Sequence, residues 1–326
     1  MSFFAVLLAL IVEQLRPVHP GNPVHSLFLG WIRWVGWNFD AGRDRHASVV
    51  WAVSVAVPAL LVAAVFALLA HYSLVLALAW DLLVLYFTLG FRQFSYYFTD
   101  IRDALEQGRE DEARQLLREW RHLDASELPR TELLRHVIEH SLLAAHRHVF
   151  GVFFWFVLGS ALGLGPAGAV FYRLSEFCWR YWVHKMQRDG AVNERLARRA
   201  RNLFSLIDFV PSRLTAVGFA IVGNFEEAVE SWRQNAGLWA DGNVGVLLST
   251  AAGATGLALG GAHPLAQPTA SLPTAAMPLD PPEGQGSTQG AAPQFDHLRS
   301  VVGLVWRSVV LWLLMLVLLS LANLLG

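Results

Sequence analysis

The sequence predicts an all-α, polytopic integral membrane protein, and three observations support this fold class. Hydrophobic residues make up 54% of the 326 residues and charged residues only 16%, whereas soluble domains carry about 25% charged residues. The mean hydropathy is +0.40, and several uncharged stretches approach the roughly 20 residues that a helix needs to cross a bilayer. The 13 Trp and 20 Phe residues suit a protein whose aromatic rings lie at the membrane interface.

Composition also excludes several functional classes. The 25 Lys and Arg residues nearly balance the 26 Asp and Glu residues, so the strongly basic surface of a nucleic-acid-binding protein is not expected. The single cysteine, Cys178, rules out an intramolecular disulfide and a thiolate cage for zinc or an iron–sulfur cluster. We therefore expect the lipid bilayer, and no nucleic acid, as a partner.

Three stretches are the clearest membrane spans. Residues 49–70 are uncharged, and residues 74–91 follow after a short break, so the two are expected to form an antiparallel helical hairpin. Residues 308–325 form another uncharged run near the C-terminus. Residues 1–12 are apolar but short, and they lack the positive charge and cleavage site of a signal peptide. We interpret them as a retained N-terminal membrane helix.

The apolar stretch 149–172 is interrupted by glycines and a proline at 159–168. The basic segment 173–202 and the charged segment 92–148 on either side both have the arginine content of cytoplasmic segments. The sequence therefore predicts a re-entrant hairpin whose apex is the Gly/Pro break, with a plain membrane span as the alternative. Irregular backbone at membrane depth is tolerated where it is buried in protein or lines a wet cavity.

These segments define the expected organisation. Segment 92–148 is predicted to form a small helical cytoplasmic lobe, with two helices separated at Gly108 and a third over 128–149. The complete division is: 1–91, N-terminal membrane helices; 92–148, the charged helical segment; 149–262, a membrane core with the re-entrant hairpin and a broken helix; 263–300, a Pro- and Gly-rich flexible linker; 301–326, a C-terminal transmembrane helix.

Ionisable residues inside the apolar segments are the first candidates for function. Asp81, Asp208 and Arg213 lie in such segments, and such groups normally face the protein interior or a water-filled cavity. Asp208 and Arg213 stand on either side of Pro211 and could pair across a kink. The pair could serve a polar cleft, expected where it meets the 159–168 break and Asp81, or it could be purely structural.

One short motif indicates a metal site. His136, Glu139 and His140 match H-x-x-E-H, which places two histidines on one helix face with a carboxylate as general base. A catalytic zinc site needs three protein ligands and an open position, and no third ligand stands at a defensible spacing. We therefore expect no metal, and a membrane metallohydrolase is the third functional hypothesis.

Several segments resemble the CobD/CbiB and AmpE superfamily of bacterial inner-membrane proteins. Residues 204–215, FSLIDFVPSRLT, are similar to its N/D-x-[IV]-P-x-R-L signature, and residues 15–31 to its N-terminal HP-V region. Phe153, Phe154 and Trp155 followed by 163–172 resemble its F-W and glycine-rich stretch. The resemblance also extends through 232–237 and 253–261. It implies a multi-pass protein of the bacterial inner membrane.

The two branches of this superfamily imply different activities. CobD/CbiB proteins are cobinamide synthases, which join an aminopropanol unit to a corrinoid carboxylate with ATP. AmpE-like proteins are associated with envelope or β-lactam-response signalling. The synthases carry E-N-x-x-D, N-T-L-D and D-D-L-L-N runs, and the aligned segments here are 143–147, 176–179 and 204–208. Arg147 stands at an aspartate position, and Asp208 replaces the asparagine as in AmpE.

These departures favour the AmpE-like reading. Activation by ATP needs Mg²⁺, which prefers carboxylate oxygens, and most acidic residues of the three runs are missing, although Glu139 or Glu176 could restore some. We expect a catalytically diverged envelope or signalling-associated protein without a cofactor, and assign no catalytic residue. Its partner is expected to be a small molecule or an envelope protein, and a homo-oligomer is compatible with the sequence. A corrinoid amide ligase using Mg²⁺ and ATP is the alternative. The candidate polar cleft comprises Asp208, Arg213, Asp81, Glu139 and Glu176.

Overall fold

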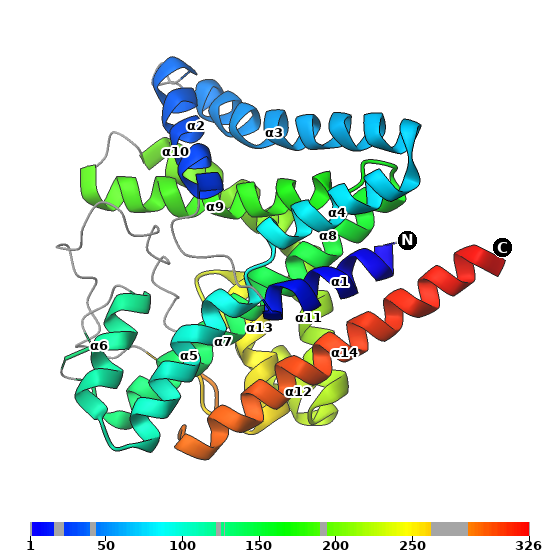
Figure 1. The fold of residues 1–326 in the computed structure, drawn as a ribbon. Helices are drawn as coiled ribbons and strands as arrows, with labels where there is room; N and C mark the ends of the chain where they lie inside the picture. Colours follow the sequence, from blue (N-terminus) through cyan, green and yellow to red (C-terminus); the bar gives the residue numbers. More distant parts are fainter. Residues whose placement is uncertain are drawn as a thin grey trace. The chain divides into compact units, whose positions relative to one another are not determined.

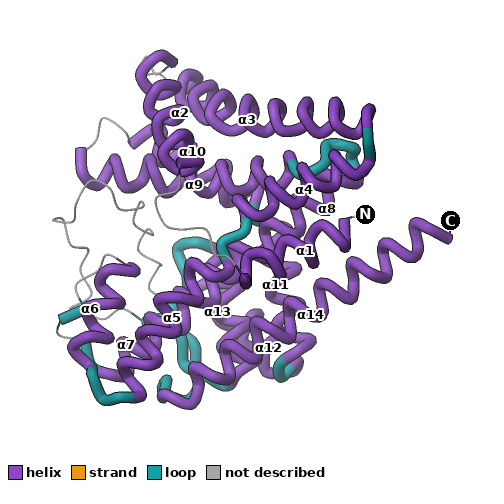
Figure 2. Tube along the Cα trace, in the orientation of Figure 1, coloured by secondary structure: helices purple, strands orange, loops and turns teal. Residues whose placement is uncertain are grey.

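The structure is a computed structural model that describes residues 2–15, 23–39, 44–121, 125–126, 128–189, 194–261 and 286–325. Within these ranges the secondary structure is helical, with two isolated β-bridges and no strand (Figure 1, Figure 2). The predicted all-α fold class is therefore confirmed. Residues 16–22 of the HP-V region lie outside the described residues.

The helices follow one another closely along the chain. Their bounds are α1 Ser2–Leu15, α2 Pro23–Phe39, α3 Asp44–Tyr72, α4 Leu74–Thr88, α5 Phe91–Glu106, α6 Glu110–Arg121, α7 Arg130–Ala145, α8 Gly151–Ala161, α9 Ala167–Asp189, α10 Glu194–Ile207, α11 Phe209–Val222, α12 Phe225–Asn235, α13 Gly242–Thr255 and α14 Phe295–Leu325. A π-helical turn, His146–Phe150, joins α7 to α8, and a 3-10 turn, Ala236–Leu238, joins α12 to α13.

In the described part of the chain, three helices are long and apolar enough to cross a membrane: His46–Tyr72, Arg130–Ala161 and Phe295–Ala322. A fourth is possible if α10 and α11 count as one broken span. The predicted span 49–70 falls within the first of these, and the predicted span 308–325 overlaps the third over residues 308–322. Helices α1 and α4 are apolar but shorter. The third helix expected in the cytoplasmic lobe is continuous with α8, so part of that segment belongs to an apolar helix of 32 residues.

The chain divides into two compact units. Unit 1 comprises Met1–Gln93, Arg147–Ile207 and Leu316–Gly326, and unit 2 comprises Phe94–His146 and Asp208–Met315. In unit 1, α9 is central, because α3, α4, α8 and α10 all contact it. Its core is aromatic: Trp179 stacks on Phe204, with ring centroids 5.0 Å apart.

The Gly/Pro break forms the turn of a tight helical hairpin inside unit 1. Helix α9 runs back along α8 after the turn, and two glycines show how closely the helices pack. A Cβ on Gly168 would come within 1.9 Å of the Trp155 carbonyl oxygen, and a Cβ on Gly151 would overlap the ring of Tyr172. Gly163 and Gly165 adopt positive φ in the turn, which glycine accommodates without strain. A helical hairpin is therefore present at the predicted break, and its re-entrant character, with both ends on one side of the membrane, remains a prediction.

Unit 2 is organised around α13. This helix is buried over most of its length and contacts α7, α11 and α12, as its small residues predict. Gly253 allows a close approach to α12, since a Cβ there would lie 2.2 Å from the Glu227 carbonyl oxygen. Helices α5 and α6 are separated at Gly108, which has φ of +73°, as predicted.

The expected flexible linker differs from the structure in its last part. Residues 262–285 lie outside the described residues, but 286–291 bind to the segment after α13. The Leu259 amide donates to the Thr288 hydroxyl at 2.8 Å, and the Ala258 amide donates to the Ala291 carbonyl at 2.9 Å. Helix α14 then begins at Phe295, before the boundary expected at 301. Amino-acid composition carries no information about such backbone hydrogen bonds, so the sequence did not predict them.

Candidate functional site

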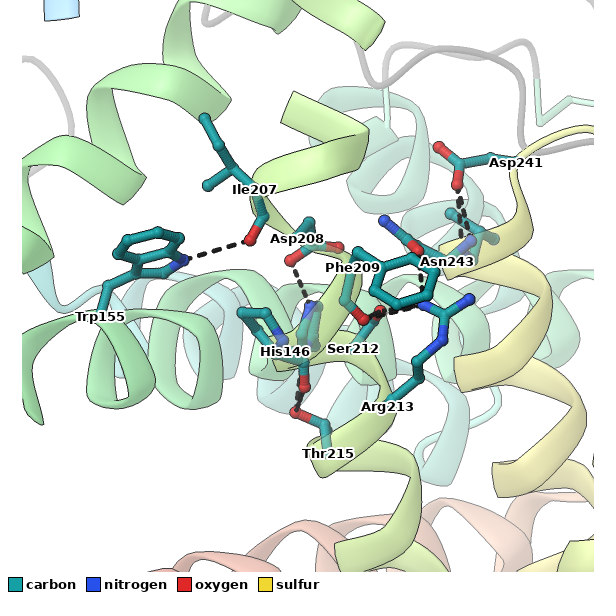
Figure 3. A network of polar contacts seen from close by, with 12 residues as sticks. His146, Trp155, Ile207, Asp208, Phe209, Ser212, Arg213, Thr215, Asp241 and Asn243 are labelled. Atoms are coloured by element: carbon teal, nitrogen blue, oxygen red, sulfur yellow. Dashed lines mark hydrogen bonds and ion pairs between the residues drawn. The ribbon is translucent and has the colours of Figure 1, made fainter. Parts of the chain in front are cut away.

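A buried polar network in unit 2 joins two segments that are far apart in sequence. His146 places its Nε2 atom 2.8 Å from Asp208 Oδ1 and its Nδ1 atom 2.9 Å from Thr215 Oγ1 (Figure 3). His146 is 0% exposed, Asp208 is 4% exposed, and Thr215 is fully buried. Buried polar groups of this kind are stable only when they are hydrogen-bonded, and these three satisfy one another.

Local backbone irregularities place both halves of the network. His146 opens the π-helical turn between α7 and α8, and such π-bulges often occur at functional sites. Asp208 is the residue at the break before α11, where its φ of −85° and ψ of −6° end α10 and begin the next helix. Thr215 lies two turns further along α11, on the same face.

Pro211 explains why the chain breaks at Asp208. Proline has no backbone N–H, so the carbonyl four residues earlier, at Ile207, has no helical partner. The indole Nε1–H of Trp155 donates to this carbonyl at 3.3 Å. Pro211 itself occupies the first turn of α11, where proline is tolerated. The Ser212 amide resumes the helical pattern by donating to the Asp208 carbonyl at 3.0 Å.

The hydrogen bonds determine where the protons of the network lie. The Thr215 hydroxyl donates to the Pro211 carbonyl at 3.0 Å, so its oxygen can only accept from His146. The Nδ1 atom of His146 must therefore carry a proton. One further proton is shared between Nε2 and the Asp208 carboxylate. The pair is thus neutral overall, as imidazolium with carboxylate or as imidazole with carboxylic acid.

The sequence suggested Asp208 as the partner of Arg213, but the structure gives Arg213 other partners. Its Nη1 atom donates to Asn243 Oδ1 at 3.0 Å and to the Phe209 carbonyl at 2.8 Å, and its guanidinium lies over the Phe209 ring at 3.4 Å. Asp208 instead bonds to His146 (Figure 3). A direct Asp208–Arg213 pair across the kink is therefore wrong: Arg213 binds the start of α13, where Asp241 caps the helix.

Glu139 of the H-x-x-E-H motif is a structural acceptor in unit 2. Its Oε1 atom accepts the Gly260 amide at 2.6 Å and lies 3.6 Å from Arg135 Nε. His136 Nδ1 contacts Arg121 at 3.2 Å, and the ring of His140 meets Trp120 edge to face. Among the described residues, no group of three His, Cys, Asp or Glu side chains is arranged to hold a metal ion.

The other two predicted residues lie in unit 1. Glu176 is completely buried on α9 between Arg173 and Arg180, with its Oε1 atom 3.1 Å from Arg180 Nη2. Asp81 is 7% exposed on α4, which packs against α1, α3 and α9. The structure therefore places Asp208, Arg213 and Glu139 in one unit and the other two in the second. A cavity common to all five remains a prediction.

Two residues of the network, His146 and Thr215, were not among the predicted site residues. A histidine within an apolar helix that needs a buried partner was the available signal for His146. Thr215 gave no signal of its own, because a hydroxyl in a helix usually bonds to the carbonyl one turn earlier.

The sequence is similar to one protein family and to several curated relatives. A family model described as CobD/Cbib protein matches residues 2–286. Cobalamin biosynthesis protein CobD of Stutzerimonas stutzeri is 31% identical over 283 residues, which cover 86% of this chain and 84% of that protein. The protein of the same name from Chromobacterium violaceum is 30% identical over 178 residues, 55% of this chain and 54% of that protein.

A weaker similarity connects the chain to the second branch. Protein AmpE of Shigella flexneri is 28% identical over 102 residues, which cover 31% of this chain and 34% of that protein. No solved structure matches the chain. The family model extends over most of the sequence, from the first residue of α1 to Gly286. The chain belongs to the CobD/CbiB family.

Proposed function

We propose that the protein is a catalytically diverged, AmpE-like member of the CobD/CbiB family, a multi-pass protein of the bacterial inner membrane with a role in envelope signalling. The observation that carries this proposal is the environment of Arg147. This residue occupies a position where the family resemblance implies an aspartate in the synthases. In unit 1 it is buried, and its guanidinium lies 5.1 Å from the centre of the Trp179 ring.

The Arg147 position is built into the core of unit 1. Trp179 is buried and stacks on the buried ring of Phe204. The Arg147 side chain therefore packs against a pair of stacked aromatic rings. A cation over an aromatic face is stabilised most when it is desolvated. A positive charge fixed here would repel a divalent cation, because the two charges interact strongly at low dielectric.

The carboxylates that could hold Mg²⁺ do not fit that task as the structure arranges them. Mg²⁺ needs one or two carboxylates with free oxygens beside substrate phosphates. Glu176 is held by Arg173 and Arg180, Glu139 by an amide and Arg135, and Asp208 by His146. Each is already bound to donors within its own unit. We therefore derive no step through a nucleotide or a metal ion.

In this proposal the His146–Asp208–Thr215 network is the functional polar element of unit 2. Broken helices with exposed backbone groups beside charged side chains form ligand sites in other membrane proteins. The network is neutral overall and fully hydrogen-bonded, which suits a structural or sensing role better than turnover. A small molecule or an envelope protein that rearranges the helix break would change its hydrogen bonding.

The alternative is a corrinoid amide ligase, and one observation favours it. The relative named Cobalamin biosynthesis protein CobD shares 84% of its length with this chain, whereas Protein AmpE shares 34%. Under this alternative the protein would join an aminopropanol unit to a corrinoid carboxylate. The missing acidic residues would then have to be replaced by carboxylates elsewhere in the chain.

Complementation separates the two functions. A bacterial host that lacks its own corrinoid amide ligase would be transformed with this chain or, as the positive control, with the host's own ligase. We expect growth on a corrinoid precursor from the control alone. As a second arm, the purified protein would be incubated with cobyrate, aminopropanol and MgATP, and the product sought by mass spectrometry.

Growth, or formation of the corrinoid amide, would overturn the proposal in favour of the ligase. The signalling role has its own readout, the induction of β-lactamase in the native host after the gene is deleted. We expect induction to change. Unchanged induction together with failed complementation would reject both functions.

A further inference from the structure

Helix α10 carries a dense group of exposed arginines. Arg195, Arg198, Arg199 and Arg201 are all exposed, whereas Leu196, Ala197, Ala200 and Phe204 form its buried stripe. The four arginines lie within the first eight positions of a helix of 14 residues that contains one acidic residue, Glu194. The outward face of this helix is therefore strongly positive.

Among the described residues, this charge is only partly balanced by carboxylates. Arg198 pairs with Glu194, and the Arg198 side chain is still 69% exposed. Within the part of the chain that the structure describes, no carboxylate lies within ion-pair distance of Arg199 or Arg201. These two side chains are thus available to an external anion.

The arginines stand at the entrance to a membrane segment. The apolar part of the α10 and α11 pair begins after Arg201, and the two helices together pass as a broken span. Clusters of arginine directly beside a membrane helix are attracted to anionic lipid headgroups. An anion reaching this face is therefore expected to come from the bilayer surface.

Aromatic residues mark the same boundary in unit 1. Both α10 and α2 contact α3, and α2 lies near the N-terminal end of α3 (Figure 1). The Trp31 indole of α2 donates to the Ser54 carbonyl of α3 at 3.3 Å. Trp37 is 87% exposed on α2, and Trp34 and Leu27 are also exposed. Exposed tryptophans next to a span are typical of the membrane–water interface.

We propose that the arginine face of α10 binds the phosphate headgroups of anionic phospholipids, with Arg199 and Arg201 as principal contacts. Guanidinium groups suit this role because they donate paired hydrogen bonds to phosphate oxygens. The exposed tryptophans of α2 hold the neighbouring surface at headgroup depth. This binding is independent of whether the protein signals or forms amide bonds.

The test compares lipids and variants on the full-length protein in neutral detergent. Native mass spectrometry would count retained phosphatidylglycerol and phosphatidylcholine, and thermal unfolding would report stabilisation by each lipid. We expect the wild type to prefer phosphatidylglycerol. Arg199→Gln with Arg201→Gln should reduce that preference roughly 30-fold, because each charge near an anionic surface contributes about fivefold.

Two controls make the result specific. Arg118→Gln with Arg233→Gln removes the same charge from exposed positions on α6 and α12 and should leave the preference unchanged. Arg199→Lys with Arg201→Lys keeps the charge and should retain most of it. The proposal fails if the wild type binds both lipids equally, if the control pair loses as much as the α10 pair, or if millimolar inorganic phosphate displaces the lipid.

Discussion

The partner of Asp208 can be identified by a double-mutant cycle. Replacing His146 by leucine keeps a similar volume but leaves the buried Asp208 carboxylate without its 2.8 Å contact. Breaking a buried pair from one side costs about 3–5 kcal/mol. For a chain of this size, each kcal/mol lowers the unfolding temperature by about 2–4 °C. We expect His146→Leu to be strongly destabilising.

Asp208→Asn should be much milder, because the network holds one shared proton and no net charge. The asparagine amide can donate to Nε2 of a neutral His146, while Nδ1 continues to donate to Thr215. One charge-assisted hydrogen bond is exchanged for a neutral one, a loss of about 1–2 kcal/mol. The double variant contains no stranded charge, so the two changes should couple by about 1–3 kcal/mol.

Thermal and denaturant unfolding in detergent would measure all four proteins of this cycle. A second cycle with Arg213→Gln provides the matched control, because Arg213 bonds to Asn243 and the Phe209 carbonyl. We expect its coupling to Asp208→Asn to be far smaller than that of His146. Equal coupling in both cycles, or an Asp208→Asn variant as unstable as His146→Leu, would refute the proton assignment.

Two further outcomes test the hairpin. Gly168→Ala should destabilise the protein by about 1–3 kcal/mol, because the new Cβ would overlap a backbone carbonyl of α8. The control, Gly30→Ala, has open space around the new Cβ and should leave the stability unchanged. Equal unfolding midpoints for the two variants would contradict the close packing of α8 and α9. Cysteines introduced at Gln107 and Glu194 should both react with a thiol-specific label added from the cytoplasmic side. The native Cys178 should stay unlabelled, because burial raises the pKa of its thiol and shields it from the reagent. Labelling from opposite sides would reject the re-entrant topology.

The sequence predicted the features that depend on local composition. Hydropathy located the long apolar helices that contain residues 49–70 and 308–325, because a helix that is to cross lipid must be apolar along its length. Glycine spacing located the turn between α8 and α9 and the small residues that bury α13. Gly108 separated α5 from α6 as predicted. Each of these signals lies within one short stretch of sequence.

The features that the sequence missed depend on contacts between distant segments. Sequence proximity suggested Arg213 as the partner of Asp208, but the structure supplies His146 from 62 residues away. The residues 286–291 looked like linker because their composition is rich in glycine and polar residues, yet their backbone pairs with 256–261. Neither partner could be identified without knowing which helices meet.

Pro211 connects the backbone and the polar network at this site. Because proline cannot donate, it frees the Ile207 carbonyl, which then accepts a hydrogen bond from the Trp155 indole N–H. The freed turn lets Asp208 leave the helical path and bond to His146, and the Pro211 carbonyl in turn accepts the Thr215 hydroxyl. That last bond obliges His146 to donate through Nδ1. Position 211 therefore acts on the site in two ways: the missing N–H of proline places the break, and the backbone carbonyl holds the Thr215 hydroxyl and so leaves Nδ1 of His146 to donate. A ligand that moved the break would change both.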